Sequence, residues 1–269
     1  MGRLFAVVVT VIALVSAAIF ALHVWWLPPD ISAHGSRIDR QLNETMVTAG
    51  ILFVAAQLAL GLFVWRFDVR DGMPPRAVKT FPGGVTPLVV LAILFVGIEI
   101  LVLTFVGSKV WASVYQTPAP AEALQIEVEA EQFAFYFRYA GPDGKFGTMH
   151  PDLMNDATQN FFGLDPANDT TARDDIVVGT LVIPVNQPID LRLHAKDVNH
   201  SFYVPELRIQ QDFVPGMVIP LHFTATQTGK YELVCTQLCG LGHYNMRAYI
   251  EVKTPADFAQ WLKAQAATS

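Results

Sequence analysis

Residues 235–246 read CTQLCGLGHYNM and contain both cysteines of the 269-residue chain. Two thiols, one imidazole and one thioether therefore lie within one short stretch, at Cys235, Cys239, His243 and Met246. Thiolate and thioether sulfur favour Cu(I), and imidazole binds copper in both oxidation states. No carboxylate interrupts the stretch, so the sequence predicts a copper site in preference to a zinc, magnesium or calcium site.

The predicted copper loop connects two strands of a domain that contains many short strands. A polar insertion at 149–175, rich in Asp, Asn, Thr and Gly, interrupts their succession. Short strands without helical periodicity indicate an all-β sandwich or barrel, which we place at residues 122–253. In the tail at 254–269, Thr254 and a following proline predict a short helix to about residue 264. The predicted strands are 124–130, 133–139, 176–184, 189–193, 201–204, 218–225, 229–235 and 246–252.

The N-terminal part of the chain has the composition of a membrane protein. Hydrophobic residues make up 52% of the chain and concentrate before residue 115. Segments 4–26, 46–65 and 85–106 are each long enough to cross a hydrocarbon layer of about 30 Å. We therefore predict a transmembrane helix pair within 44–110, at about 46–66 and 85–107, preceded by an apolar segment at 1–26.

Charged and aromatic residues predict the orientation of these helices. The loop between the second and third segments carries four basic residues, and positively charged loops remain cytoplasmic. The β domain then lies on the extracytoplasmic side. The basic residues of the loop are Arg66, Arg70, Arg76 and Lys79, and the expected interfacial anchors are Trp65, Trp111 and Tyr115.

The first apolar segment has two interpretations. Arg3 followed by an apolar run is typical of a signal peptide, but the run is long and lacks a small-x-small site before His23. A retained helix is therefore favoured, and whether residues 1–26 are cleaved stays open. The following residues, 28–43, are expected to form a short outer loop or an interfacial helix.

Two acidic features bear on partners. Glu99 lies inside the third apolar segment, where a charge costs about 2.5–3.5 kcal/mol on insertion scales. Glu99 is either a proton relay or ligand, or a polar contact with a partner helix. The polar contact is favoured, and the role of Glu99 stays open.

The net charge is −6, with the excess acid after residue 120, which excludes nucleic acid as a partner and suits a basic protein.

The residue set of the loop decides between two kinds of copper site. A mononuclear blue site needs two histidines, one cysteine and a weak axial methionine, and leaves Cys235 unexplained. Two thiolates four positions apart can instead bridge two copper ions. The second histidine is expected at His200, which follows a turn, and this choice is favoured over His150, His194 and His222.

A disulfide is the alternative for the two cysteines, because an oxidising compartment favours it. It would require neither the histidine nor the methionine of the loop. Closing so short a loop would also stabilise the fold little. The metal site is therefore favoured.

These motifs together resemble subunit II of haem–copper oxidases, the cytochrome c oxidase subunit that carries the CuA centre. The resemblance covers residues 45–253 and implies a membrane helix pair followed by a cupredoxin domain. Related CuA domains occur in nitrous-oxide reductases, which lack the helix pair. The motifs are CxQxCxxxHxxM at 235–246, DVNHS at 197–201, DFVPG at 212–216, and EQFAF at 131–135 ahead of GPDGKFG at 141–147.

The resemblance implies a role for each site residue. Two cysteines would bridge the copper ions, each histidine would bind one ion, and two weak axial ligands would complete the set. Phe133 stands at the family's inferred electron-entry position. The implied ligands are His200, Cys235, the backbone carbonyl of Gln237, Cys239, His243 and Met246.

The implied function is electron transfer in a bacterial respiratory terminal oxidase. Family members take electrons from cytochrome c and pass them to haem in subunit I, where oxygen is reduced to water and protons are pumped. Subunit III and membrane lipid are further expected partners. The chain would lie in the inner membrane with its copper domain on the periplasmic side, and by itself would catalyse no bond chemistry.

Three differences from the family limit how much of its function the resemblance implies for this chain. Many relatives have Glu in place of Gln237, and its carboxylate helps to bind magnesium at the subunit I interface, so that ion is doubtful here. Relatives usually have Trp at Phe133 and Phe135, which leaves the identity of the cytochrome donor open. The acidic residue that relatives use for proton uptake has no counterpart, since Glu99 lies too deep in its segment.

Other functions stay open beside this one. The chain could be a membrane-anchored mononuclear cupredoxin that carries electrons, or the CuA subunit of a nitric oxide reductase. A copper chaperone or sensor is disfavoured because strands hold the loop on both sides. The haem types and the terminal acceptor are also open.

Overall fold

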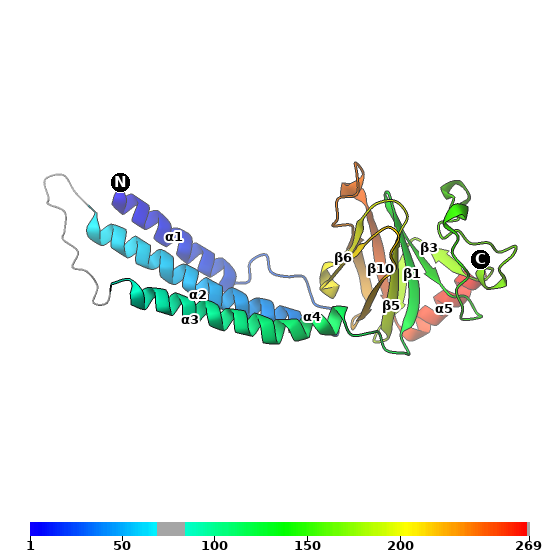
Figure 1. The fold of residues 1–269 in the computed structure, drawn as a ribbon, viewed down its shortest axis with the longest axis horizontal. Helices are drawn as coiled ribbons and strands as arrows, with labels where there is room; N and C mark the ends of the chain where they lie inside the picture. Colours follow the sequence, from blue (N-terminus) through cyan, green and yellow to red (C-terminus); the bar gives the residue numbers. More distant parts are fainter. Residues whose placement is uncertain (69–83, 268–269) are drawn as a thin grey trace. The chain divides into compact units, whose positions relative to one another are not determined.

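The computed structural model describes residues 1–68 and 84–267, and the chain divides into two compact units (Figure 1). The helical unit consists of residues 1–27 and 37–110. The β-unit consists of residues 28–36 together with the chain from Trp111 onward. The fold class is confirmed: apolar helices precede an all-β sandwich.

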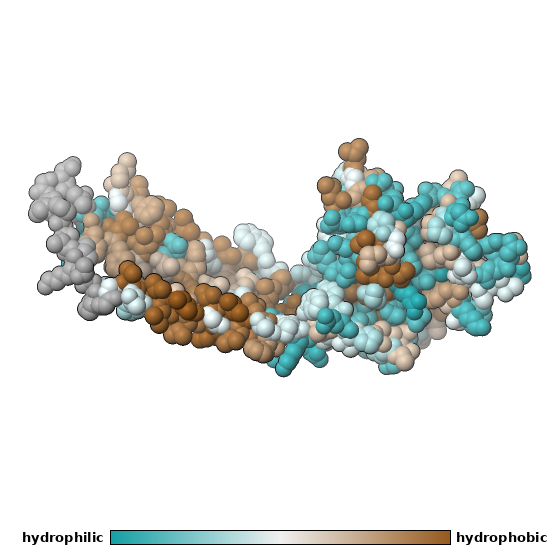
Figure 2. Space-filling view, in the orientation of Figure 1, coloured by the Kyte–Doolittle hydropathy of each residue, from teal (hydrophilic) through white to brown (hydrophobic). Residues whose placement is uncertain are grey.

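Three helices of the described residues are long and apolar enough to cross a membrane. They are α1 (Gly2–Ala21), α2 (Gly35–Phe67) and a continuous helix from Thr86 to Tyr115, made of α3 (Thr86–Val102), a π-helical turn (Leu103–Gly107) and α4 (Ser108–Tyr115). None of the most apolar window of the third helix is buried, and Figure 2 shows its apolar surface. Such a large apolar surface requires lipid or another protein to cover it.

Helix α2 begins earlier than the hydropathy predicts. It starts at Gly35, so residues 35–43 are helical and continuous with the apolar stretch, and the loop predicted over 28–43 is wrong beyond residue 34. The hydroxyl of Ser32 accepts a hydrogen bond from the Gly35 amide at 2.9 Å, which supplies a partner at the helix start. The polar residues 35–45 include good helix formers and extend the helix past its apolar stretch. At 33 residues, α2 is about 50 Å long.

Part of the charge argument lies outside the described residues. Arg66 belongs to the last turn of α2. The other basic residues of the predicted cytoplasmic loop, Arg70, Arg76 and Lys79, fall within 69–83, which the structure does not describe.

The β-unit contains two five-stranded sheets, in the orders β3-β2-β1-β5-β8 and β4-β10-β9-β6-β7. The pairs β1–β5 and β4–β10 are parallel, and the remaining neighbours are antiparallel. A C-terminal helix, α5 (Pro255–Ala266), is capped by Thr254, whose hydroxyl accepts a hydrogen bond from the Asp257 amide. The strands are β1 (Leu124–Glu131), β2 (Ala134–Tyr139), β3 (Ile176–Val178), β4 (Leu181–Pro184), β5 (Pro188–Ala195), β6 (His200–Val204), β7 (Ile209–Phe213), β8 (Ile219–Thr224), β9 (Gly229–Val234) and β10 (Arg247–Lys253).

Two strand predictions are wrong in detail. The apolar run at 176–184 forms two strands, because the chain leaves one sheet as β3 and enters the other as β4 after Gly179 and Thr180. Strand β7 was not predicted, because its residues are mostly polar and it lies at the edge of its sheet. The other predicted strands are present, with boundaries that differ by a few residues.

The segment before α2 is part of the β-unit. Ile31 is almost fully buried in the core, its amide donates to the carbonyl of Glu206, and its own carbonyl accepts from the Thr226 amide. The Ala33 amide donates to the carbonyl of Thr224, at the end of β8. This short connector is therefore held to the sheet by backbone hydrogen bonds.

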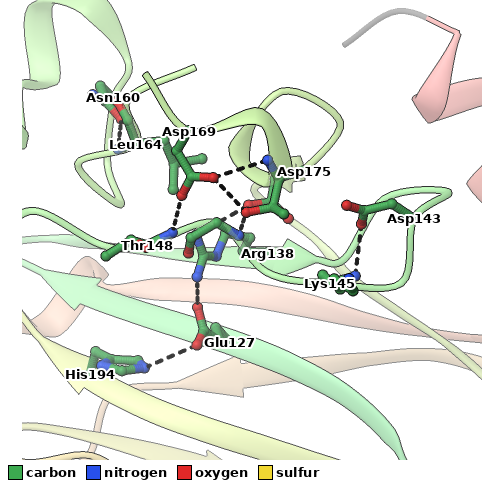
Figure 3. A network of polar contacts seen from close by, with 12 residues as sticks. Glu127, Arg138, Asp143, Lys145, Thr148, Asn160, Leu164, Asp169, Asp175 and His194 are labelled. Atoms are coloured by element: carbon green, nitrogen blue, oxygen red, sulfur yellow. Dashed lines mark hydrogen bonds and ion pairs between the residues drawn. The ribbon is translucent and has the colours of Figure 1, made fainter. Parts of the chain in front are cut away.

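A buried arginine attaches the polar insertion to the first sheet (Figure 3). Arg138 on β2 forms ion pairs with Glu127 on β1 and with Asp175, and it donates to the carbonyl of Gly147 at 3.0 Å. The rings of Phe146 and Phe162 lie about 5 Å from its guanidinium. Because Arg138 is only 1% exposed, this charge is compensated entirely within the protein.

Replacing this arginine tests the attachment. Arg138→Met should lower the free energy of unfolding by about 3–5 kcal/mol, because two carboxylates would be left buried without their cation. The measurement is denaturant unfolding of the detergent-solubilised chain. Arg192→Met, at an exposed position on β5, is the matched control and should change stability by less than about 0.5 kcal/mol. Equal effects of both substitutions would contradict the proposed attachment.

Candidate metal centre

The loop 235–246 joins two antiparallel neighbours, β9 and β10. The Cys235 amide donates to the carbonyl of Met246 at 3.1 Å, which closes the base of the loop. A 3-10 turn at His243–Asn245 then directs the chain back to β10. The two ends of the loop are thus fixed by the sheet.

Strand pairing brings the remaining histidine to this loop. His200 is the first residue of β6, and β6 lies beside β9 in the same sheet. The ligand atoms of His200, Cys235 and Cys239 all lie within 4.8 Å of one another, and all three residues are buried. This is the one group of at least three His, Cys, Asp or Glu side chains with metal-binding spacing among the described residues.

The other predicted ligands surround the two thiols. The Cys239 sulfur lies 3.5 Å from His243 Nδ1 and 3.7 Å from the Met246 sulfur. The Cys235 thiol lies 3.2 Å from the carbonyl oxygen of Gln237. All six residues that the sequence analysis selected are therefore gathered at one end of the sandwich. Their role as copper ligands stays a prediction.

The two cysteines are free thiols with their sulfurs 3.9 Å apart. A disulfide bond is about 2.05 Å long, so the thiols are not bonded to each other. Two sulfurs that each lie about 2.3 Å from a shared metal ion are at most about 4.6 Å apart. The observed separation therefore suits two sulfurs that share a metal ion.

His200 is oriented as a metal-binding histidine. Its Nε2 lies 2.8 Å from an oxygen of Asp197, while its Nδ1 is buried and has no hydrogen-bond partner among the described residues. A carboxylate on one ring nitrogen commonly fixes the orientation and tautomer of a histidine that binds metal through the other. A buried nitrogen without a partner is otherwise costly. These residues thus fit a copper ion.

The electrostatics of the thiols also favour a cation. Burial raises the pKa of the Cys235 thiol, but the neighbouring His200 imidazole and the Ser201 amide outweigh it and leave the pKa below its ordinary value. Burial, and then the charge of Cys235, raises the pKa of Cys239. The Cys235 thiolate therefore forms readily, and its negative charge disfavours ionisation of the Cys239 thiol. A cation bound between the sulfurs would stabilise both thiolates.

Phe133 lies directly against the copper loop. A β-carbon added at Gly242 would come within 2.4 Å of the Phe133 ring, so the loop approaches the ring as closely as a glycine allows. The preceding residue, Gln132, donates from its side-chain amide to the carbonyl of Cys239 and from its backbone to Asp197. Phe133 itself is 39% exposed and thus extends from the loop to the surface.

Comparisons with known proteins agree with this geometry. A model of the family described as cytochrome c oxidase subunit II, periplasmic domain, matches residues 159–253. The chain is 32% identical over 262 residues to the alternative cytochrome c oxidase subunit 2 of Bradyrhizobium diazoefficiens, an alignment covering 97% of this chain and 91% of that protein. This chain belongs to the cytochrome c oxidase subunit II family.

Two further proteins are similar to this subunit II. Cytochrome c oxidase subunit 2 of Thermostichus vulcanus is 30% identical over 253 residues, covering 87% of this chain and 77% of that protein. The crystal structure of the periplasmic domain of subunit II of cytochrome oxidase of Bradyrhizobium japonicum is 26% identical, with a TM-score of 0.41. That likeness covers 56% of this chain and 99% of the solved domain.

Family membership has direct consequences for this subunit II. It is a copper-containing electron-transport subunit of an oxidoreductase complex and partners subunit I of a haem–copper oxidase. Its apolar helices suggest insertion in the membrane, and the match to a periplasmic domain places the β-unit outside.

Sequence reasoning assigned no role to two residues of the site. Asp197 and Gln132 both lie in motifs that carried the resemblance, DVNHS and EQFAF, but their contacts depend on strand pairing far along the chain. The rejected histidines lie elsewhere: His194 is on β5, 4.0 Å from Glu127, and His222 is on β8. His150 precedes a short 3-10 turn in the insertion.

Metal binding should release protons. Because one of the two thiols remains protonated near neutral pH, copper loading of the metal-free chain should release about one proton or more, and affinity should rise with pH. A pH indicator in weakly buffered solution measures the release. Met246→Leu removes no acidic proton and should match the natural chain, whereas Cys239→Ala should release fewer. A proton count independent of Cys239 would contradict the thiolate assignment.

Proposed function

We propose that this subunit accepts electrons from a c-type cytochrome at a binuclear copper centre and passes them to haem in subunit I. The observation that carries the proposal is the pair of buried thiols, 3.9 Å apart, enclosed by two imidazoles, a thioether and a backbone carbonyl. Bound copper supplies a one-electron redox couple. The proposed ligands are His200, Cys235, the carbonyl of Gln237, Cys239, His243 and Met246.

The number of donor groups favours two metal ions. A tetrahedral site needs four donors, and this site gathers six. If both sulfurs are shared, one imidazole and one weak axial group remain for each of two ions. A mononuclear site would leave one thiol and the Gln237 carbonyl without a role as ligands, hydrogen-bonded to each other.

The chain holds these groups in place in a way that suits electron transfer. The base of the loop is closed by the β9–β10 pairing, Asp197 orients His200, and Gln132 binds the carbonyl of Cys239. Four of the six proposed ligands are thus held by contacts that do not depend on the metal. Ligands that hardly move when the charge changes keep the reorganisation energy low, as electron transfer requires.

The exposed tip of the loop supports docking of an electron donor. Leu238, Leu241 and Tyr244 are 77%, 98% and 89% exposed, and Figure 2 shows hydrophobic surface at the tip of this loop. Large apolar side chains gathered on a surface mark an interaction site. Phe133, beside the loop, lies where an electron would enter. We propose that a c-type cytochrome covers this tip.

The wider assembly is inferred from the family. We infer a bacterial inner-membrane location, oxygen reduction to water with proton pumping in the complex, and subunit III as a further partner. Magnesium at the subunit I interface is not included, because Gln237 lacks a carboxylate. We also infer the division into 1–26, 44–110, 122–253 and 254–269 as segment, helix pair, copper domain and tail.

Removing one bridging sulfur tests the binuclear centre. Cys235→Ser should abolish the seven-line copper pattern in electron paramagnetic resonance, because two equivalent copper nuclei give seven hyperfine lines and one nucleus gives four. Thr236→Ser, the neighbouring exposed residue, is the control and should keep the pattern. A four-line signal in the natural chain would favour the mononuclear cupredoxin, and an unchanged signal in Cys235→Ser would exclude a bridging role.

Donor docking is tested at the most exposed apolar residue of the loop tip. In the assembled oxidase, Leu241→Ser should raise KM for reduced c-type cytochrome about five-fold or more, with little change in kcat, because binding loses an apolar contact. Leu153→Ser, on the polar insertion, is the matched control. The copper spectrum should stay unchanged in both. If KM is the same in both variants and the natural enzyme, the donor does not dock at this tip.

A further inference from the structure

A cationic pocket lies between α2 and the end of the third helix. It has a volume of about 430 Å³ and is lined from one side by Arg37, Arg40, Gln41 and Glu44. These positions recur at helical spacing, so they share one face of α2. Phe105 and Lys109 line the other side. The volume falls within the range of about 300–1,000 Å³ that small-molecule sites occupy.

The three cations of this pocket outnumber its acidic residues. No hydrogen bond or ion pair joins Arg37, Arg40 or Lys109 to another described residue. Glu44 is the one acidic lining residue, so the pocket carries a net positive charge of about two. Three unpaired cations around one cavity repel each other and together favour an anion.

The pocket lies at the depth of lipid headgroups and just beyond it. Lys109 lies three residues after the apolar stretch of the third helix, or about 4.5 Å, while Arg40 and Arg37 lie six and nine residues before that of α2, or about 9 and 13.5 Å. Headgroups occupy a layer of about 5–8 Å on each side of the hydrocarbon, so the two arginines start outside this layer and would reach back towards it. Long basic side chains reach along such a boundary.

The basic residues of the pocket lie on the side of the membrane where such residues are less common. The third helix leads into the periplasmic β-unit, so the pocket lies at the outer end of the helices. Lys and Arg next to membrane helices are normally enriched on the cytoplasmic side. Figure 2 shows the apolar surface of the third helix giving way to hydrophilic surface towards α4. The positive-inside tendency therefore does not explain the basic residues at this end, and a bound anion would account for them.

We propose that this pocket binds the headgroup of an anionic glycerophospholipid of the outer leaflet. The two guanidinium groups and the ammonium would hold the phosphate, because arginine pairs with phosphate through two parallel hydrogen bonds. Gln41 and Glu44 would accept hydrogen bonds from headgroup hydroxyls, and the Phe105 ring would pack against the glycerol backbone. The lipid would fill space beside helices that the chain leaves uncovered.

Native mass spectrometry of the intact oxidase tests this site. The purified complex is mixed with equal amounts of phosphatidylglycerol and phosphatidylcholine that carry the same acyl chains. The variant Arg37→Gln/Arg40→Gln/Lys109→Gln should bind phosphatidylglycerol about 100-fold more weakly, with one molecule fewer retained per complex. Lys145→Gln/Lys230→Gln/Lys263→Gln removes the same charge elsewhere and should retain it. Arg37→Lys/Arg40→Lys should keep most of the preference.

Three results would overturn the proposal. The first is an unchanged lipid preference in the pocket variant. The second is loss of subunit I from that variant with lipid retention intact, which would assign the cations to protein docking. The third is displacement of phosphatidylglycerol by inorganic phosphate at similar concentration, which would show that the pocket takes any small anion. The copper signal does not enter this readout, so the proposed electron-transfer role is tested separately.

Discussion

The antiparallel pairing of β9 with β10 is the constraint on which the metal centre depends. It brings Cys235 opposite Met246, at the two ends of one loop, and fixes their separation by a backbone hydrogen bond. The neighbouring strand β6 then delivers His200 to the same point. Because these contacts belong to the sheet, the site is formed by the fold itself. A metal that binds there meets groups already in position, which lowers the entropy lost on binding.

The kind of site was predictable from the sequence because its ligands are concentrated. Five of the six proposed ligands lie within one loop, and soft donors at that density indicate copper without any knowledge of the fold. His200 could be selected because it follows a turn. The membrane helices were predictable because apolar length alone determines whether a segment can span a bilayer. The strand pattern sufficed for the fold class.

The remaining features depend on contacts between distant parts of the chain. Helix α2 begins at Gly35 because Ser32 provides a hydrogen-bond partner, and no hydropathy pattern marks this start. Strand β7 is polar because it lies at a sheet edge, so its sequence carries no apolar signal. The contacts of Asp197 and Gln132 with the site arise from pairing between strands, which local sequence does not encode.

The attachment of the connector before α2 to β8 has a consequence for folding during synthesis. Residues 30–33 cross to the outer side early, but their partners at 206 and 224–226 are synthesised almost two hundred residues later. During synthesis the connector therefore lacks these hydrogen bonds until residues 206 and 224–226 have been made. Once they form, the chain closes a circuit in which both outer ends of the α2–α3 hairpin enter the same folded unit. The sandwich thus links the two chain segments that lead to these helices through its own hydrogen bonds.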